Sequence, residues 1–312
     1  MGEGGGPRGG TGGTPGPTGR VDTATEVFLA HRGLLFTVAY EMLGSAADAE
    51  DVLQETWLRW ERVDLDGVRE RRAYLVRVTV RQALMRLRTV RRRRETYVGP
   101  WLPEPLLTAP DVAEDVALAE SVSMAMLLVL ETLGPTERAV FVLREVFEVD
   151  YGEIAEAVGK TPATVRQIAR RARGHVAARR PRGGVSPAEA RDALAAFRRA
   201  VETGDLQGLL DVLAPDVVLL GDGGGVVPAV RAPVVGASRV APLIVTGLAR
   251  QGATASLRPA QVNGHPALIL RLDDALDTVL AASVEGGLIT ALYAVRNPEK
   301  LARIGRETTV HR

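Results

Sequence analysis

The side chains with the clearest chemical potential are basic and lie within residues 157–182, which carry eight basic residues and no acid. Arginine suits phosphate oxygens and guanine edges, and glutamine can read adenine. The predicted DNA-reading set is Thr164, Arg166, Gln167, Arg170, Arg171 and Arg173. This spacing indicates a helix that contacts base edges in the major groove of duplex DNA.

A helix-turn-helix over residues 150–173 would position these side chains. Asp150 and Glu153 form a predicted capping box for its first helix, which ends at Gly159, where glycine tolerates the left-handed conformation. Thr161 caps the second helix, with Pro162 at its first position. The inward stripe of that helix is Val165, Ile168, Ala169 and Ala172. An ordinary helical hairpin with a solvated basic face is the alternative.

A second basic surface is expected on a helix predicted over residues 69–93. Residues 69–94 contain eleven Arg and one acid. The DNA-facing set is Arg77, Arg81, Arg88 and Arg91. The expected inward set is Leu75, Val78, Gln82 and Met85. A solvated helix end that complements the helix dipole is the alternative. Binding of single-stranded RNA is disfavoured, because only Tyr74 and Tyr97 lie nearby to stack on bases.

An acidic helix precedes this basic one. Residues 22–66 carry ten acids and three Arg, and Ser45 with Asp48 forms a capping box that starts the helix. One side is predicted to carry Ala49, Val52, Leu53, Thr56, Trp57 and Trp60, whereas Glu50, Asp51 and Glu55 lie elsewhere on its surface. The basic and acidic segments explain why a chain with 39 Lys and Arg against 38 Asp and Glu can still bind a polyanion, most simply nucleic acid.

Several classes of protein are excluded by composition. The absence of Cys rules out disulfides, thiolate metal sites and cysteine nucleophiles. No apolar run approaches the 18 residues typical of a membrane span, and the segment after Met1 does not resemble a signal peptide. No His and carboxylate spacing matches a metal site, so neither a metal nor another cofactor is expected. A cytoplasmic location is the corresponding expectation.

Gly- and Pro-rich segments divide the chain into expected units. They are a disordered tail at 1–20, a helical unit at 21–94, a Pro-containing linker at 95–112, a second helical unit at 113–180, a linker at 181–187 and an α+β unit at 188–312. Helices are predicted at 24–43, 113–133, 135–146, 150–158, 161–178, 186–202, 205–213 and 236–250. Strands of a curved antiparallel sheet are predicted at 217–221, 226–235, 253–262, 266–272, 278–284 and 287–296, with turns at Asn263-Gly264 and Gly286-Gly287.

Residues 24–178 together resemble a bacterial extracytoplasmic-function (ECF) sigma factor. The resemblance runs through residues 39–45 (AYEMLGS), 48–57 (DAEDVLQETW), 133–135 (LGP) and 138–141 (RAVF). It implies two all-α sigma domains, region 2 and region 4, that bind core RNA polymerase at its β′ clamp and β flap. Helix 69–93 would melt and read the minus-ten promoter segment, and helix 161–178 would read the minus-thirty-five segment. The implied polymerase-binding set is Asp48, Glu50, Asp51, Gln54, Glu55 and Trp57.

A narrower resemblance links the chain to ECF group 41, which carries a C-terminal SnoaL-like domain with a cone-shaped α+β fold. Three motifs carry it: Trp101, Leu102, Pro103, Glu104 and Pro105; Asp222, Gly223, Gly224 and Gly225; Asn297, Pro298, Glu299, Lys300 and Leu301. Here Val226 follows the glycines, where the family usually has Lys. The resemblance implies control of the sigma core in cis, and we expect the three motifs to pack together.

Two other functions stay open on the sequence alone. A helix-turn-helix regulator could sense a small ligand with its α+β domain and act without core polymerase. It would have no need of an acidic helix bearing Trp57 and Trp60. A SnoaL-like enzyme would use an Asp and His pair, for which the domain offers Asp222, His265 and the terminal His311. Catalysis is not expected, because Asp222 beside three Gly fits a turn better. The cone fold also predicts a pocket for a small molecule.

Overall fold

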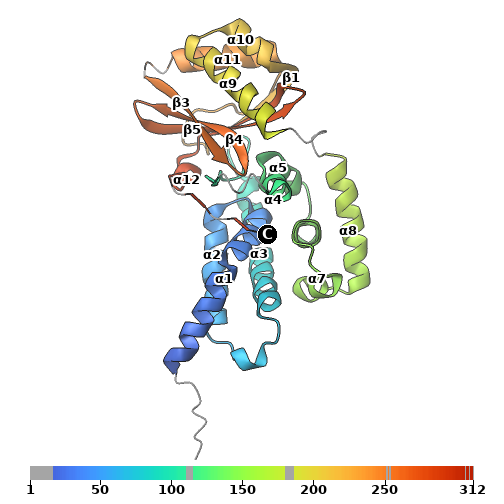
Figure 1. Cartoon of the computed structure of the whole chain (residues 1–312). Coiled ribbons are helices and arrows are strands. Elements are labelled where there is room, and N and C mark those ends of the chain that lie inside the picture. The colour runs from blue at the N-terminus through green and yellow to red at the C-terminus, as the bar shows by residue number, and fades with distance from the viewer. Residues whose placement is uncertain are drawn as a thin grey trace, which may run out of the picture.

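The computed structural model describes residues 17–109, 115–179, 186–250, 252, 254–305, 307–308 and 310–311 (Figure 1). Residues 1–16 of the expected tail, 110–112 of the first expected linker and 181–185 of the second expected linker lie outside them. The first helix, α1 (Pro17–Leu43), begins before the predicted residue 24, so residues 17–20 are helical rather than part of a tail. Proline at the first helical position is preorganised for this start, because its φ is already helical.

Three helices form the first helical unit. After α1 come α2 (Ala46–Trp60), a 3₁₀ turn η1 (Leu65–Gly67) and α3 (Arg71–Glu95). Ser45 caps α2 as predicted, because its side chain accepts from the backbone N–H of Asp48. Leu75 and Gln82 are buried as predicted, whereas Val78 is half-buried and Met85 is 51% exposed. The inward stripe of α3 runs instead through Leu75, Val76, Thr79, Val80, Ala83, Leu87 and Val90.

The described part of the second helical unit, residues 115–179, has five helices and a wide turn. They are α4 (Val116–Val122), α5 (Met124–Glu131), α6 (Pro135–Phe141), the π-type turn η3 (Val142–Val146), α7 (Tyr151–Val158) and α8 (Pro162–Ala177). The single helix predicted over 113–133 is wrong, because Ser123 breaks it. Ser123 has extended ψ and its hydroxyl accepts from the N–H of Met126, which makes it the cap of α5. One apolar core joins both helical units.

A mixed six-stranded sheet forms the C-terminal unit, preceded by α9 (Pro187–Thr203) and α10 (Leu206–Val212). The strands are β1 (Leu213–Asp222), β2 (Val234–Val235), β3 (Ala255–Val262), β4 (His265–Leu272), β5 (Ala275–Glu285) and β6 (Leu288–Val295), in the order β2-β1-β6-β5-β4-β3. Helix α11 (Ala237–Ala249) joins α9 and α10 over one face (Figure 1). This is the α+β cone of the SnoaL-like fold.

Two strand predictions need correction. The sheet is not purely antiparallel, because β1 pairs with β6 in parallel. Most of the strand predicted at 226–235 is a loop, and only β2 at its end is extended. The N–H groups of Val226 and Val227 both turn back to the carbonyl of Gly223, and Pro228 and Pro233 have no N–H to offer a neighbouring strand. The predicted turns at Asn263-Gly264 and Gly286-Gly287 are confirmed, with positive φ at all four residues.

The two faces of the sheet have different neighbours. One face packs against α9, α10 and α11 in a core that includes Phe197, Val240 and Leu292. The opposite face packs against the linker and the second helical unit in a core that includes Leu102 and Met124 (Figure 1). A short helix, α12 (Pro298–Leu301), follows β6 on this second side. Among the described helices, none combines the length and apolarity needed to cross a bilayer.

Candidate functional site

The helix-turn-helix forms as the sequence predicts. Asp150 caps α7 through the N–H of Gly152 at 2.6 Å rather than through the predicted box with Glu153, and Gly159 ends the helix with a φ of 66°. The hydroxyl of Thr161 accepts from the N–H of Thr164 at 3.2 Å and starts α8. The predicted inward residues of α8 are all buried: Val165, Ile168, Ala169 and Ala172. The two short helices therefore hold the opposite face of α8 toward solvent.

That outward face carries the predicted DNA-reading set at the edge of the molecule (Figure 1). Five of its six members are exposed: Arg166, Gln167, Arg170, Arg171 and Arg173. Thr164 is half-buried, and its hydroxyl lies 2.9 Å from that of Thr161, within the helix cap. Arg166 lies over the ring of Tyr151 at 5.9 Å, and Arg173 lies 3.6 Å from Glu145. A DNA contact through these residues stays a prediction.

The basic surface of α3, predicted over residues 69–93, is partly covered by α7. Arg77 forms a 2.7 Å ion pair with Glu156, and Arg81 donates to the backbone carbonyl of Glu156 at 2.8 Å. Arg88 is exposed, and the side chain of Arg91 lies outside the described residues. Two of the four predicted minus-ten residues thus contact the helix-turn-helix of the same chain.

The acidic helix α2 presents four carboxylates, and each lies near a basic side chain. Glu55 lies 3.7 Å from Arg59 of the same helix. Asp48 and Asp51 both contact Arg86 of α3, at 2.7 and 2.5 Å, and Glu50 contacts Arg32 of α1 at 2.7 Å. The remaining predicted polymerase-binding residues are Gln54 and Glu55, which are exposed, and Trp57, which is half-buried.

The two tryptophans of α2 have different roles. Trp57 packs edge-on against Phe28 with ring centres 5.2 Å apart, and it keeps part of its surface. Trp60 is fully buried, and its indole N–H donates to the carbonyl of Ala24 at 2.8 Å. Trp60 therefore belongs to the core, whereas Trp57, the tryptophan of the predicted polymerase-binding set, keeps surface that a partner can contact.

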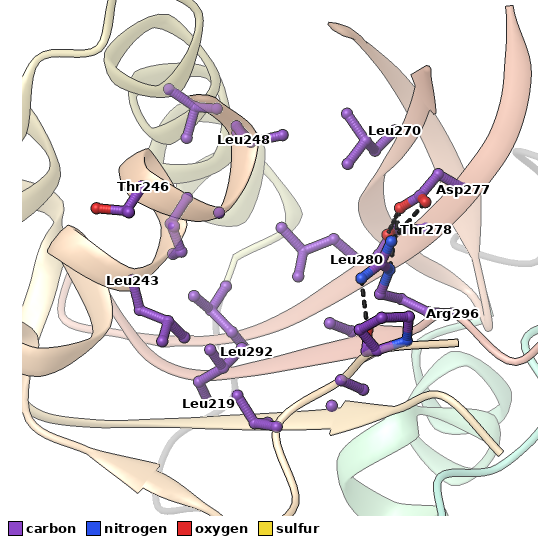
Figure 2. A pocket seen from close by; sticks show the side chains of 18 of the residues that line it. Leu219, Leu243, Thr246, Leu248, Leu270, Asp277, Thr278, Leu280, Leu292 and Arg296 are labelled. Atoms are coloured by element: carbon purple, nitrogen blue, oxygen red, sulfur yellow. Dashed lines mark hydrogen bonds and ion pairs between the residues drawn. The ribbon is translucent and has the colours of Figure 1, made fainter. Parts of the chain in front are cut away.

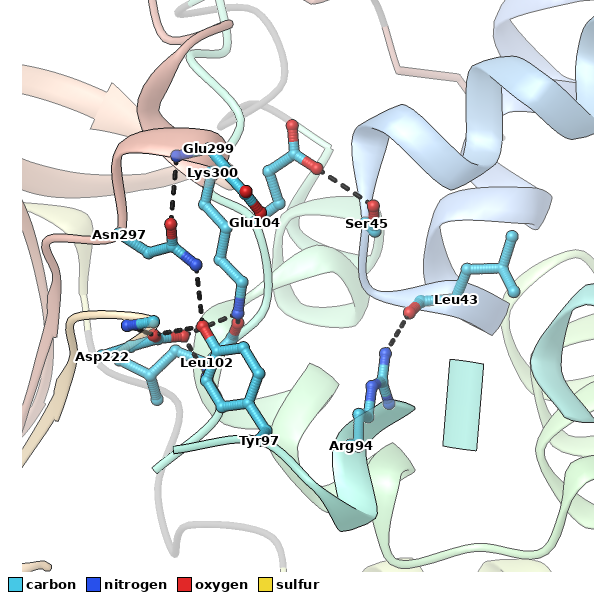
Figure 3. A network of polar contacts seen from close by, with 11 residues as sticks. Leu43, Ser45, Arg94, Tyr97, Leu102, Glu104, Asp222, Asn297, Glu299 and Lys300 are labelled. Atoms are coloured by element: carbon cyan, nitrogen blue, oxygen red, sulfur yellow. Dashed lines mark hydrogen bonds and ion pairs between the residues drawn. The ribbon is translucent and has the colours of Figure 1, made fainter. Parts of the chain in front are cut away.

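The three predicted motifs meet at one buried carboxylate, as expected from the sequence (Figure 3). Asp222 has no exposed surface and accepts from four donors. They are the hydroxyl of Tyr97 at 2.6 Å, the N–H of Leu102 at 2.9 Å, the N–H of Gly224 at 3.0 Å and the ammonium of Lys300 at 2.6 Å. Because a buried carboxylate is costly unless its lone pairs are satisfied, this carboxylate fixes the linker, the glycine loop and α12 together. We call these contacts the junction.

Close packing explains the glycines of the junction. A Cβ on Gly224, whose φ is 64°, would lie 2.4 Å from Nδ2 of Asn297, which donates to the hydroxyl of Tyr97 at 2.8 Å. Gly44, with a φ of 66°, leaves room for the ring of Trp101. Only glycine allows both the positive φ and the close approach of these neighbouring side chains. Val226, where the related motif has Lys, is 67% exposed.

Lys300 supplies the cation of the junction. Its ammonium lies over the rings of Trp101 and Tyr97, at 4.3 and 4.9 Å, and donates to the carbonyl of Leu102. Burial lowers the pKa of Lys300 to about 8, although Asp222 opposes the shift. Arg94 lies over the same Trp101 ring at 3.5 Å. Neither Tyr97 in the junction nor Arg94 beside it was predicted, and their only signal in the sequence is proximity to the Trp101 motif.

Glu104 joins the linker to the acidic helix. Its carboxylate accepts from the hydroxyl of Ser45 at 3.1 Å and from the N–H of Ala47 at 3.2 Å, so it helps to cap α2. Its backbone carbonyl accepts from the hydroxyl of Tyr40 at 2.7 Å. Burial raises the pKa of Glu104. The linker motif therefore contacts the helix implied to bind polymerase.

The Asn263-Gly264 turn is a second contact between the sheet and the helices. The Asn263 amide donates to the hydroxyl of Tyr40 at 2.7 Å and to the carbonyl of Val122 at 2.8 Å, and its oxygen accepts from the N–H of Leu106 at 3.0 Å. His265 lies 3.0 Å from the carbonyl of Ala119, and burial lowers its pKa. The sequence identified this turn but not its contacts.

Buried charges also lie between the two helical units. Glu41 of α1 is fully buried and accepts from the hydroxyl of Ser121 at 2.7 Å, and burial raises its pKa to about 8. Arg138 of α6 donates to the carbonyl of Glu41 at 2.7 Å and pairs with Glu131, and burial lowers its pKa to about 9. These groups cannot be exposed to water without separating the units.

Comparison with known proteins is consistent with this architecture. The model of Sigma-70 region 2 matches residues 27–93, and the model of Sigma-70 region 4 matches residues 123–176. The ECF RNA polymerase sigma factor SigJ of Mycobacterium tuberculosis is 36% identical over 288 residues, which cover 88% of this chain and 91% of SigJ. The probable ECF sigma factor SigI of the same species is 35% identical, over 90% of this chain and 95% of SigI.

A solved structure agrees along nearly the whole chain. The crystal structure of SigJ from Mycobacterium tuberculosis superposes with a TM-score of 0.71 and 34% identity, covering 89% of this chain and 98% of that chain. Matches to both sigma regions set aside a regulator that works without polymerase, which would need no region 2. The sigma helices and the appended domain are thus shared with a relative of nearly equal extent, and the chain belongs to the ECF family of RNA polymerase sigma factors, which act in transcription initiation.

Proposed function

We propose that the C-terminal domain of this sigma factor holds region 2 and region 4 in a closed form, and that the junction is the contact that must loosen before a promoter is engaged. In the open form, α8 reads the minus-thirty-five segment and α3 the minus-ten segment. Gln54, Glu55 and Trp57 of α2 then contact the β′ clamp, and region 4 contacts the β flap. This work takes place where polymerase is, in the cytoplasm.

The observation that carries the proposal is the contact between Arg77 and Glu156 at 2.7 Å. The two promoter segments are about 25 base pairs apart by their names, which is about 85 Å along B-DNA at about 3.4 Å per base pair. A chain in which α7 lies on α3 cannot span that distance. Regions 2 and 4 must therefore separate, and Arg77 and Arg81 become available to DNA phosphates when they do.

The junction lies where it can oppose that separation. Asp222 and Lys300 of the C-terminal domain hold the linker at Leu102, directly between the two sigma regions. The same linker caps α2 through Glu104. Contacts of the linker with the sheet therefore fix the one segment that has to extend on opening.

Replacing Asp222 tests this role. Asp222→Asn keeps the size of the side chain but leaves Lys300 without its counter-ion in a buried site, which costs about 3 kcal/mol. Run-off transcription with purified core polymerase should then give more transcript from a limiting amount of this sigma factor. Asp216→Asn, an exposed position on the same strand, is the matched control.

The comparison of Asp222→Asn with Asp216→Asn can also contradict the proposal. Near-ultraviolet circular dichroism establishes that the Asp222→Asn protein is folded. A folded Asp222→Asn protein that gives the same transcript yield as Asp216→Asn would contradict the proposal, whatever its free energy of unfolding. Deleting residues 183–312 is a less specific test, because it also exposes the apolar surface around Leu102 and Met124.

A further inference from the structure

A cavity of about 820 Å³ lies between the sheet and helices α9 and α11, as expected from the cone fold (Figure 2). This size suits a drug-sized organic molecule. Leucine side chains from both layers line most of it, among them Leu219, Leu243, Leu270, Leu280 and Leu292. The cavity is on the sheet face that points away from the sigma helices. An occupant would therefore be bound mainly through its apolar surface.

One end of the cavity is polar but carries no net charge. Arg296 donates to both carboxylate oxygens of Asp277, at 2.6 and 3.1 Å, and to the carbonyl of Pro228 at 2.5 Å. The hydroxyl of Thr278 donates to the same carboxylate at 2.5 Å. Because the ion pair is internally neutralised, this end can satisfy a neutral polar atom but gives no preference for a charged one.

The helix that covers the cavity adds positive charge. Arg239 and Arg250 of the lining are eleven positions apart, which at about 100° per residue places them on the same side of the helical path. Both are exposed, and no acidic group lies within 4 Å of either among the residues that the structure describes. Between them, Leu243 is 43% exposed although it faces the cavity. The cavity rim is therefore basic, and its wall is not closed by packing.

We propose that this cavity binds a lipophilic organic anion, with the apolar body against the leucines and the anionic group at the rim near Arg239 or Arg250. The described lining has three arginines and one carboxylate, and Arg296 already neutralises that carboxylate. The positive charges of Arg239 and Arg250 remain, and they favour an anion over a neutral or cationic molecule of equal size.

The occupant would lie next to the junction. The backbone N–H groups of Arg296 and Asn297 both donate to the carbonyl of Asp222, at 2.7 and 2.9 Å. Arg296 faces the cavity, and Asn297 belongs to the junction. An effect of the anion on transcription rests on the proposed function, whereas its binding does not.

Two fluorescent probes test the binding. 8-Anilinonaphthalene-1-sulfonate is a lipophilic anion, and N-phenyl-1-naphthylamine is the same ring system without the sulfonate. The full chain should bind the sulfonate saturably at one site, about 3- to 10-fold more tightly than the neutral amine. Arg239→Ala combined with Arg250→Ala should remove that difference and leave the affinity for the neutral amine unchanged.

Gly247 provides a position from which an added side chain can enter the cavity. It lines the cavity within α11, and a Cβ added there meets nothing within 4 Å. Gly247→Phe should weaken both probes at least about tenfold. Gly174→Phe makes the same change at an equally open helical position on α8, far from the cavity, and should weaken neither.

The outcomes separate the two proposals. Absence of saturable binding, or binding that Gly247→Phe leaves unchanged, would overturn the cavity assignment. Equal affinity for both probes would overturn the proposal that the cavity prefers an anion. If the probes bind as expected while Asp222→Asn has no effect on transcription, the cavity assignment stands and the proposed function fails. If the probes do not bind as expected while Asp222→Asn raises the transcript yield, the cavity assignment fails and the proposed function stands.

Discussion

At the scale of single residues, the packing of the C-terminal domain against the helical units depends on a few buried polar groups that join distant segments. Asp222 gathers donors from the linker, its own loop and α12, and Asn263 bonds to both helical units. The sequence predicted the motifs around Asp222 but not Tyr97 or the partners of Asn263. A tyrosine, or an asparagine in a turn, can form hydrogen bonds with many different partners. The packing of the sheet against the helices decides which partners these residues have, and no local sequence pattern reports that packing.

The pH dependence of stability should report on Glu41. Its pKa in the folded chain is about 8, against an ordinary value of 4.5, because burial disfavours the carboxylate. Between these values the folded state holds one more proton than the unfolded state. The contribution of Glu41 to the free energy of unfolding is therefore fully present below pH 4.5. It falls as the pH rises toward 8, by up to about 1.4 kcal/mol per pH unit.

Urea unfolding of the wild type and of Glu41→Gln at pH 5.5, 6.5 and 7.5 measures this effect. The amide can still accept from Ser121 but cannot ionise. We expect the free energy of unfolding of the wild type to fall relative to that of the variant as the pH rises. Glu104, whose pKa is also raised, is present in both proteins and cancels in the difference. Parallel pH profiles would show that Glu41 is not protonated in the folded chain.

Substitutions on α8 should separate base contacts from phosphate contacts. Arg170→Ala should cost about 1–3 kcal/mol of promoter affinity and relax specificity at one base pair, if Arg170 reads a base. Arg88→Ala on α3 should instead weaken binding to all sequences alike and reduce the salt dependence. Affinity measured against a set of singly substituted promoters, at two salt concentrations, distinguishes these results. A uniform loss for Arg170→Ala would mark it as a phosphate contact.

At the scale of the elements, helix caps and apolar stripes predicted most of the helices and strands. The helix-turn-helix was predictable because Asp150, Gly159 and Thr161 fix its ends locally. The break at Ser123 was not, since a serine inside an apolar run caps a helix only when the chain turns there. The parallel pairing of β1 with β6 depends on contacts between strands about 70 residues apart in the sequence, which no local pattern reports.

The contact between α3 and α7 gives a further prediction. Glu156→Lys places a cation beside Arg77 and Arg81, so α7 should be repelled from α3 and the basic surface uncovered. Affinity for non-promoter duplex DNA should rise about threefold, because an exposed ion pair is worth only about 0.2–1 kcal/mol and its reversal a little more.

Glu153→Lys makes the same change of charge on the same helix, at an exposed position with no described ion pair. It isolates the general effect of added positive charge on DNA affinity. An equal gain in the two variants would mean that the charge alone explains the result, and that α7 does not restrict access to α3.

At the scale of the whole molecule, the C-terminal domain is packed against the linker, the second helical unit and α1. The end of the chain extends this contact. Val310 is buried in the core of the helical units, and the N–H of His311 donates to the hydroxyl of Thr37 at 3.0 Å. Charge sorted along the sequence indicated two DNA-binding surfaces, but the arrangement in which α7 partly covers the basic surface of α3 is a property of the folded chain.

The most direct test of the closed form uses the absence of cysteine from the chain. Arg77→Cys and Glu156→Cys can be joined by a reducible bis-methanethiosulfonate linker, with Arg198→Cys and Glu202→Cys on α9 as the control pair. Run-off transcription with core polymerase is then compared before and after reduction of each cross-linked protein. We predict that the α3–α7 cross-link suppresses the transcript and that reduction restores it, while the control pair transcribes equally in both states. Equal transcription by the cross-linked and reduced α3–α7 protein would contradict a closed form that must open.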